Sequence, residues 1–158
     1  MTDLLQSWAS FYANHAAIRT LVAFAHVGAL IAGGGLAVAT DRIMLTGVVD
    51  DGSSRRSLLE RLQSTHGPVI ASLVLVAISG VLLFAADFDT FRYSKFFWGK
   101  MGLVALLMIN GGVLWRAERR ALSGDHRAWR TLRLSAIASL TLWFLTTLGG
   151  VALPNIGL

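Results

Sequence analysis

Two ionisable side chains lie inside apolar stretches of this sequence, where a polar group needs a specific partner. His26 interrupts the apolar run from residue 20 to residue 40, and Lys100 lies near the start of another run at residues 96–115. Ionisable groups at membrane depth are costly and usually face protein or a cofactor. A neutral imidazole is a common metal ligand, and a buried lysine that has lost its proton can also coordinate a metal. The two residues therefore predict a contact with each other or with one shared ligand.

The expected depths of the two side chains agree. If the apolar runs are helices that enter from the same side at Arg19 and Lys95, His26 lies roughly 9–10 Å and Lys100 roughly 7 Å below the edge, at 1.5 Å per residue. Both would then lie in the same leaflet. Lys100 could instead extend its ammonium group to the interface, because it is only about one turn inside. His26 could equally be a structural residue paired within the protein.

Small residues follow His26 along the same helix face. Ala29, Gly33 and Ala37 are spaced by four residues. This pattern lets another helix approach closely. It would also leave room for a flat ring beside Gly33, so two uses of the groove are predicted at this point.

The elements that must position these residues are membrane-spanning helices. The chain is 54% hydrophobic and only 15% charged, which is unusual for a soluble domain. About 20 helical residues cross a bilayer core of about 30 Å. Continuous apolar runs, rather than alternating ones, argue against a β-barrel. We therefore expect an all-α fold, a four-transmembrane-helix bundle forming a single domain over residues 1–158, with spans at about residues 20–40, 67–86, 96–115 and 132–153.

The segment before the first span predicts a short helix. Apolar and aromatic residues recur at helical spacing within residues 2–16: Leu4, Leu5, Trp8, Phe11 and Tyr12. Such a segment is typical of an amphipathic helix that lies in the membrane interface. The alternative is an arm that packs on the bundle.

Positive charge is distributed unequally between the two ends of the predicted bundle. The two long loops and their flanks carry ten arginines: Arg42, Arg55, Arg56, Arg61, Arg116, Arg119, Arg120, Arg127, Arg130 and Arg133. The other end carries four basic residues: Arg19, Arg92, Lys95 and Lys100. The positive-inside rule places the arginine-rich end in the cytoplasm and both termini outside it. Topology thus explains the net charge of +5, and we expect the lipid bilayer rather than nucleic acid as the partner.

Three polar residues mark the cytoplasmic end of the first two spans. Asp41 and Arg42 end the first apolar run, and His66 precedes the second on the same side. We expect an interfacial clamp in which Asp41 pairs with Arg42 or a neighbouring arginine, or caps across to the second span. A solvated stop signal is the alternative. The second span is expected to begin after His66-Gly67-Pro68, because proline suits the first turn of a helix, and a separate surface helix is expected to begin at Ser57.

Several common chemistries are not indicated. We expect all nine acidic residues to lie at the interfaces or in loops, so no carboxylate pair is predicted within the spans. Phosphate-binding loops and HExxH helices are absent from the sequence. The chain has no cysteine, which excludes disulfides, thiolate metal sites and covalent c-type haem attachment. Hydrolase or kinase activity is therefore not predicted.

Short motifs give the chain a resemblance to known membrane proteins over roughly residues 20–116. They are His26 with Gly33-Gly34-Gly35, DRIMLTG at residues 41–47, SGVLLF at residues 79–84 and FFWGK at residues 96–100. The layout is similar to small uncharacterised bacterial membrane proteins with four helices. It also resembles, more distantly, the copper-resistance D-type membrane domain and the HemJ-type protoporphyrinogen oxidase. The resemblance implies a bacterial inner membrane location and, from the last type, a haem b bound by His26 and Lys100.

The sequence thus leads to three hypotheses about function. The first is a small integral membrane protein that binds b-type haem for electron transfer in the outer leaflet, exchanging electrons with a quinone or a redox partner protein. His66 cannot share that haem, because His26 lies roughly 21 Å from the cytoplasmic end of its helix. The second is a non-enzymatic accessory or scaffold protein in which His26 and Lys100 pair directly. The third is a copper-handling protein, although the four methionines form no evident cluster of soft ligands. No reaction is assigned from two matching positions.

Overall fold

The computed structural model describes residues 2–46 and 52–156, and these residues are almost entirely helical. This confirms the all-α prediction for the described part of the chain. The helices are α1 (Thr2–Asn14), α2 (Ala16–Thr46), α3 (Gly52–Ala86), α4 (Phe88–Phe91), α5 (Lys95–Leu122) and α6 (Ala128–Ile156).

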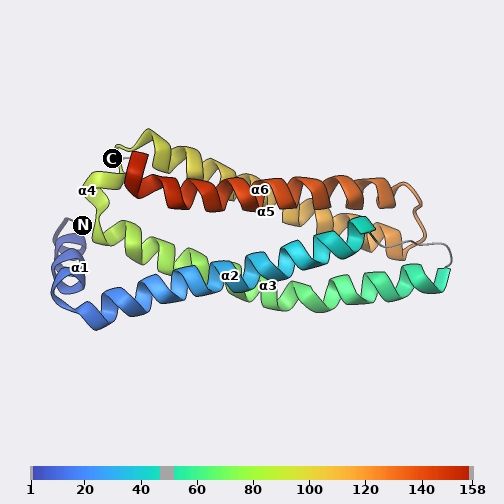
Figure 1. Cartoon of the computed structure of the whole chain (residues 1–158), viewed down its shortest axis with the longest axis horizontal. Helices are drawn as coiled ribbons and strands as arrows, with labels where there is room; N and C mark the ends of the chain where they lie inside the picture. Colours follow the sequence, from blue (N-terminus) through green and yellow to red (C-terminus); the bar gives the residue numbers. More distant parts are fainter. Residues whose placement is uncertain (1, 47–51, 157–158) are drawn as a thin grey trace.

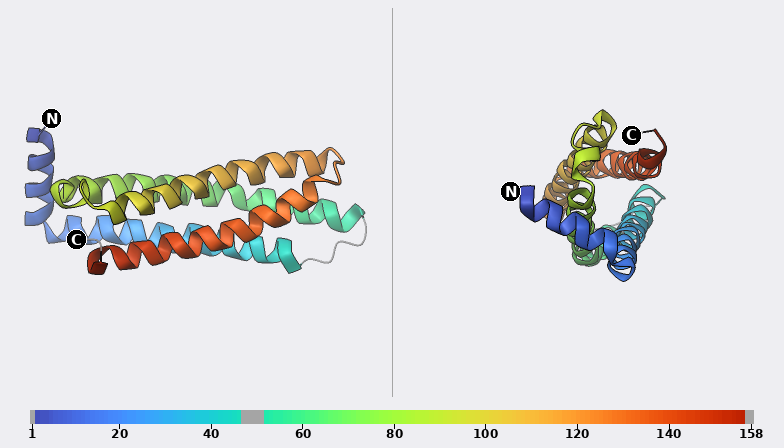
Figure 2. Two further views of the ribbon diagram at one scale, coloured as in Figure 1. Left: turned by 90° about the horizontal axis from the view of Figure 1, so that it is seen from above. Right: turned by 90° about the vertical axis from the view of Figure 1, so that its left-hand side faces the viewer.

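The long helices α2, α3, α5 and α6 lie side by side and alternate in direction (Figure 1). Helix α2 packs most extensively on α3, and α5 on α6, while α2 also packs on α6. Helices α3 and α5 share fewer contacts, among them the stacked rings of Phe84 and Phe97, whose centroids are 4.9 Å apart. Viewed along the axis, α2 and α5 therefore occupy opposite corners (Figure 2). Both termini lie at one end of the molecule.

The short helix α1 crosses that end at a steep angle to the long helices (Figure 2). The indole of Trp8 donates a hydrogen bond to the carbonyl oxygen of Leu82, with a distance of 2.9 Å between the nitrogen and the oxygen. The predicted N-terminal helix is thus present and is attached to α3. Its position in a membrane interface stays a prediction.

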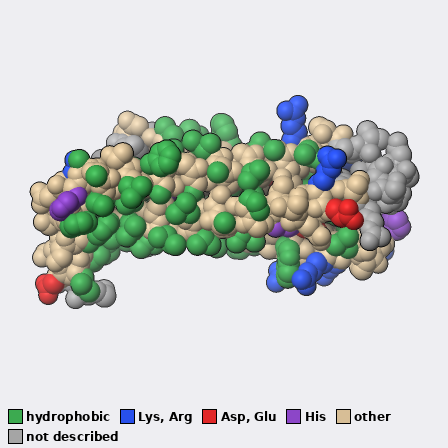
Figure 3. Space-filling model, turned by 90° about the horizontal axis from the view of Figure 1, so that it is seen from below, with side chains coloured by type: hydrophobic (Ala, Val, Ile, Leu, Met, Phe, Trp, Pro, Cys, Tyr) green, Lys and Arg blue, Asp and Glu red, His purple; other side chains and the backbone are tan. Residues whose placement is uncertain are grey.

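The surface of the long helices is apolar over most of their length. Within the described residues, α2, α3, α5 and α6 are long and apolar enough to cross a membrane. Each exposes large apolar side chains, for example Phe24 (73%), Val81 (65%), Met108 (64%) and Phe144 (71%). Soluble proteins rarely expose such extensive apolar surface. Lysine and arginine side chains gather at the end opposite the termini (Figure 3).

The helices extend beyond the predicted spans at this arginine-rich end. The predicted break at Gly67-Pro68 is wrong, because α3 continues through Pro68. Proline in a helix interior removes one backbone hydrogen bond. Leu59 and Leu62, which are 3% and 2% exposed, bury the preceding turns of α3 and so offset that loss.

An apolar cluster holds the extended ends together. It joins residues from all of the long helices: Met44, Leu59, Leu62, Ala117, Ala121, Ala128, Leu132 and Ala136. Leu132 and Ala136 are fully buried at 0% exposure. The alanines that α5 and α6 contribute to this cluster are small, so these two helices can approach closely here.

Candidate functional site

His26 lies on α2 and is anchored to α3 through one ring nitrogen. Its Nδ1 is 3.2 Å from the carbonyl oxygen of Val76 and 3.0 Å from Oγ of Ser79. A carbonyl oxygen can only accept, so the contact with Val76 is a hydrogen bond in the tautomer that has its hydrogen on Nδ1. The hydroxyl of Ser79 donates to the carbonyl oxygen of Leu75 at 2.6 Å, so it too is an acceptor toward the ring. In the neutral imidazole, Nε2 is therefore the unprotonated nitrogen and has a free lone pair.

Gly80 provides the space for this arrangement. A Cβ atom at Gly80 would lie 3.3 Å from Cε1 of His26, which is closer than most such contacts. The Ser79-Gly80 pair thus supplies both an acceptor and room for the ring. The sequence motif contains these two residues, but their roles could not be assigned without the register of α3 against α2.

Lys100 lies on α5, half-buried against α6. A Cβ atom at Gly150 would lie 3.5 Å from Nζ, and one at Gly149 would lie 3.7 Å from Cγ. The ammonium group is close enough to His26 for the two to interact electrostatically. The structure therefore brings the two predicted residues to the same region. The ring nitrogen bonds described above go to α3, however, and none of the hydrogen bonds among the described residues joins His26 to Lys100.

The glycine groove is filled by neighbouring helices. A Cβ atom at Gly33 would lie 2.6 Å from Cβ of Ser72, and one at Gly34 would lie 3.2 Å from the ring of Trp143. The groove was predicted to admit either another helix or a flat ring, and in the structure other helices occupy it. Gly33 does not provide clearance for a flat ring in this packing.

The fit of a haem to these residues is therefore partial. A ring N–H bonded to a backbone carbonyl is the usual support for a metal-ligating histidine, so His26 fits, and Lys100 is close by, whereas Gly33 does not fit. Within the described residues, no group of three or more His, Cys, Asp or Glu side chains could hold a metal ion. A haem iron needs only one or two protein ligands, so that finding does not bear on it.

A second group of polar residues lies at the arginine-rich end. Asp41 is only 3% exposed, and its carboxyl interacts with the hydroxyl of Ser139 on α6. Asp41 is therefore not a solvated residue. The partner shown is a hydroxyl of α6 rather than Arg42, which is exposed.

His66 also has a partner that the sequence did not suggest. Its Nε2 lies 3.4 Å from Oε1 of Glu118 on α5. Glu118 was expected in a loop, yet α5 continues through it, and the residue is 1% exposed. The expected loop at Glu118 is therefore wrong, while its position relative to a membrane interface stays a prediction.

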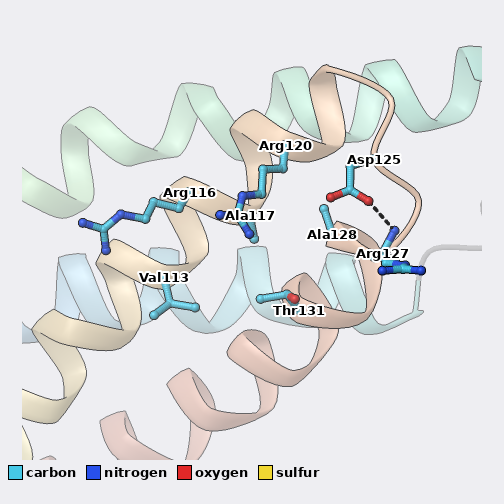
Figure 4. Close-up of a pocket in the computed structure, with 8 residues that line it drawn as sticks. All are labelled: Val113, Arg116, Ala117, Arg120, Asp125, Arg127, Ala128 and Thr131. Carbon is cyan, nitrogen blue, oxygen red and sulfur yellow. Dashed lines mark hydrogen bonds between the residues drawn. The ribbon is translucent and has the colours of Figure 1, made fainter.

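A shallow cavity of about 170 Å³ lies beside the turn between α5 and α6. Arginine side chains border it (Figure 4), and the carboxylate of Asp125 accepts a hydrogen bond from the backbone N–H of Arg127 at 2.9 Å. The lining residues are Val113, Arg116, Ala117, Arg120, Asp125, Arg127, Ala128 and Thr131. It is separate from the His26 region, since residue 113 follows Lys100 by roughly 20 Å of helix.

The helix lengths, the apolar surface and the charged end are those of a small integral membrane protein with several spans. No family model matches the chain, and no characterised protein or solved structure resembles it closely enough to count as a match. Its function must therefore be argued from its own side chains.

Proposed function

We propose that this chain is a four-helix membrane bundle that binds a b-type haem through Nε2 of His26. The haem would lie in the half that carries both termini, and we propose that this half is in the outer leaflet of a bacterial inner membrane, because the positive-inside rule favours the arginine-rich end in the cytoplasm. Helix α1 would lie along the outer interface.

The observation that carries the proposal is the state of the His26 ring. Two acceptors, the Val76 carbonyl and the Ser79 hydroxyl, face Nδ1. They fix the tautomer and the ring orientation, and they leave the lone pair of Nε2 for a ligand. A metal bond at Nε2 would use that lone pair and so satisfy both ring nitrogens.

The remaining residues would support that site. When bound, a b-type haem would carry one electron between its ferric and ferrous forms, exchanged with a quinone or a partner protein. Lys100 is the candidate for a second ligand, because its flexible stem lies against Gly149 and Gly150 and a lysine that has lost its proton can coordinate a metal. The apolar helices would exclude water from the region.

An absorption spectrum tests the proposal. We expect protein that is produced with ample haem and purified in mild detergent to show a redox-sensitive Soret band. His26→Ala should abolish this band, while Lys100→Ala should alter its position or shape. His15→Ala is the matched control, because His15 is an exposed histidine at the same end of the molecule and should leave the band unchanged. A colourless wild-type protein under these conditions would contradict haem binding.

Close packing at Gly33 and Gly34 favours a second candidate, an accessory membrane protein without a cofactor. The contacts of these glycines with Ser72 and Trp143 bring α2, α3 and α6 together without a gap. In that case His26 would be a structural residue that ties α2 to α3. A colourless, metal-free preparation whose stability depends on His26 would favour this candidate.

The orientation can be tested separately. We expect a periplasmic reporter fused after Leu158 to be active and a cytoplasmic reporter at the same position to be inactive, because the arginine-rich end should stay in the cytoplasm. The reverse result would place the His26 region in the inner leaflet.

A further inference from the structure

Glu118 is the most deeply buried ionisable side chain among the described residues, with 1% exposure. Neither of its carboxyl oxygens has a hydrogen-bond partner among those residues. A polar neighbour is Nε2 of His66, which lies 3.4 Å from Oε1. The His66 side chain is 27% exposed, so the imidazole lies between the buried carboxyl and the surface.

Other polar groups lie at the same level of the molecule. The hydroxyl of Thr40 on α2 donates a hydrogen bond to that of Thr65 on α3 at 3.3 Å. Asp41 follows Thr40 in α2, and His66 follows Thr65 in α3. Asp41 also has one oxygen, Oδ2, that is buried without a hydrogen-bond partner. Neighbouring positions on the same helices, Met44, Leu62 and Ala117, belong to the buried apolar cluster, so water has little access from that side.

Few groups are available to balance a charge on Glu118. Helix α3 contributes His66, whose Nε2 lies 3.4 Å from Oε1. The Asp41 carboxyl on α2 interacts with Ser139 of α6, and as an acid it cannot balance a negative charge. The arginines of α5 and α6 at this end are exposed: Arg116, Arg119, Arg120, Arg130 and Arg133. An ionised carboxylate without hydrogen bonds in the interior costs several kcal/mol. The pair must therefore be neutralised by a proton, held on the carboxyl or on the imidazole.

A metal ion is a weaker explanation of the unpartnered oxygens. Asp41, His66 and Glu118 do not form a group that could hold a metal, according to the geometry of the described residues. The nearest neighbour of the carboxyl is instead a side chain that itself exchanges protons near neutral pH.

We propose that Glu118 and His66 form a proton-binding site that exchanges with water at the arginine-rich end. The exchange breaks the O–H bond of Glu118 as an N–H bond forms at Nε2 of His66, which converts carboxylic acid and imidazole into carboxylate and imidazolium. The imidazolium then loses a ring proton to water, and the reverse sequence reloads the carboxyl. This site does not depend on haem and lies far from His26 along the helices.

The composition of the chain allows a direct test. Glu60 and Glu118 are the only glutamates in the sequence, and Glu60 is exposed on α3. Glutamate labelled with ¹³C at the side-chain carboxyl therefore gives two infrared signals. Glu60→Gln leaves Glu118 as the only labelled glutamate in a protein whose core is unchanged.

We expect the Glu60→Gln protein in mild detergent to retain the band of a protonated carboxyl at neutral pH. Glu118→Gln should lack this band, and in Glu60→Gln/His66→Gln it should persist to higher pH because the proton acceptor is gone. A labelled glutamate that ionises at the acidic pH of a free side chain would overturn the proposal. Loss of the band on adding Na⁺ or K⁺ at constant pH would overturn it in favour of a cation site.

Discussion

The two histidines on the inner faces of α2 and α3 differ in what surrounds them. Nδ1 of His26 faces two acceptors, the Val76 carbonyl and the Ser79 hydroxyl. Nε2 of His66 faces a carboxyl that has no other polar partner among the described residues. Both rings are partly buried, so burial alone does not distinguish them.

The difference shows how neighbours select the chemistry of an imidazole. Acceptors that cannot release a proton fix one tautomer, which leaves the opposite nitrogen as a ligand. A carboxyl can exchange a proton with the ring, so the same side chain becomes part of a proton site. One chain thus contains a candidate ligand histidine at the end with the termini and a candidate proton-exchange histidine toward the other end.

The largest expected effect separates these two roles. His26→Ala should remove the Soret band completely and leave the infrared band of Glu118 unchanged. His66→Gln should leave the Soret band unchanged and make the infrared band of protonated Glu118 persist to higher pH, because the two sites share no residues. The measurement is the visible and infrared spectra of both variants, each labelled with [¹³C]glutamate in a Glu60→Gln background.

A change of both spectra by either substitution would contradict the separation. It would mean that the sites are coupled through α2 and α3, since these helices carry both histidines. Wild-type protein with no band of either kind would remove both assignments.

A large effect on stability is expected at Gly33. In Gly33→Ala the new methyl group would lie 2.6 Å from Cβ of Ser72, and a Cβ atom cannot rotate away. Overpacking of this kind should cost up to about 3 kcal/mol. Gly35→Ala is the matched control, because a Cβ there has no neighbour within 4 Å. Unfolding of both variants in denaturant with mild detergent provides the comparison, and equal stability would contradict the close contact between α2 and α3.

A smaller effect is expected at Asp41. Asp41→Ala removes the partner of Ser139 and should cost about 1–2 kcal/mol, because a buried hydroxyl loses its acceptor. Asp41→Asn retains an acceptor oxygen and should cost less. Arg42→Ala should leave stability unchanged if the bond to α6 is what matters. The measurement is thermal unfolding in detergent, and equal losses in Asp41→Ala and Arg42→Ala would restore the predicted clamp between neighbours.

The sequence was sufficient to predict the helical class and the apolar cores of the long helices. An uninterrupted apolar run predicts a membrane-spanning helix, because about 20 helical residues cross the bilayer core. The helix ends were not predicted, since charged residues such as those at 116–122 resemble a loop. A signal for helix was present there: Leu107, Leu114, Ala117 and Ala121 continue a spacing of three, four and seven residues. Following this face would have shown that Glu118 points inward.

The candidate site was only half predictable for a different physical reason. His26 and Lys100 stand out because they are polar residues in apolar runs. Every residue has a backbone carbonyl, so the sequence does not indicate that the carbonyl of Val76 faces His26. That contact depends on how α3 is positioned against α2. Glycines in a groove are equally ambiguous, because a missing side chain can make room for a ligand or for the close approach of another helix. Here the Ser72 contact at Gly33 decides for the helix.

The smallest expected effect concerns the anchoring of His26. Ser79→Ala removes one of two acceptors, but the carbonyl of Val76 at 3.2 Å from Nδ1 remains. Hydrogen bonds between membrane helices contribute about 0.6 kcal/mol on average, so the loss of stability should be of that size. The Soret band should be retained, because the tautomer is still fixed by Val76. Ser72→Ala is a suitable control, since it alters a serine of α3 that contacts Gly33 rather than His26.

The informative quantity in this comparison is the haem midpoint potential. A weaker hydrogen bond at Nδ1 makes the imidazole a poorer donor to iron, so Ser79→Ala should shift the potential while Ser72→Ala should not. Gly80→Ala should produce a shift as well, because its methyl group would lie 3.3 Å from Cε1 of His26 and must displace the ring. Potentials that are identical in all of these variants would mean that α3 does not position the ligand, and the role assigned to Ser79 would then be wrong.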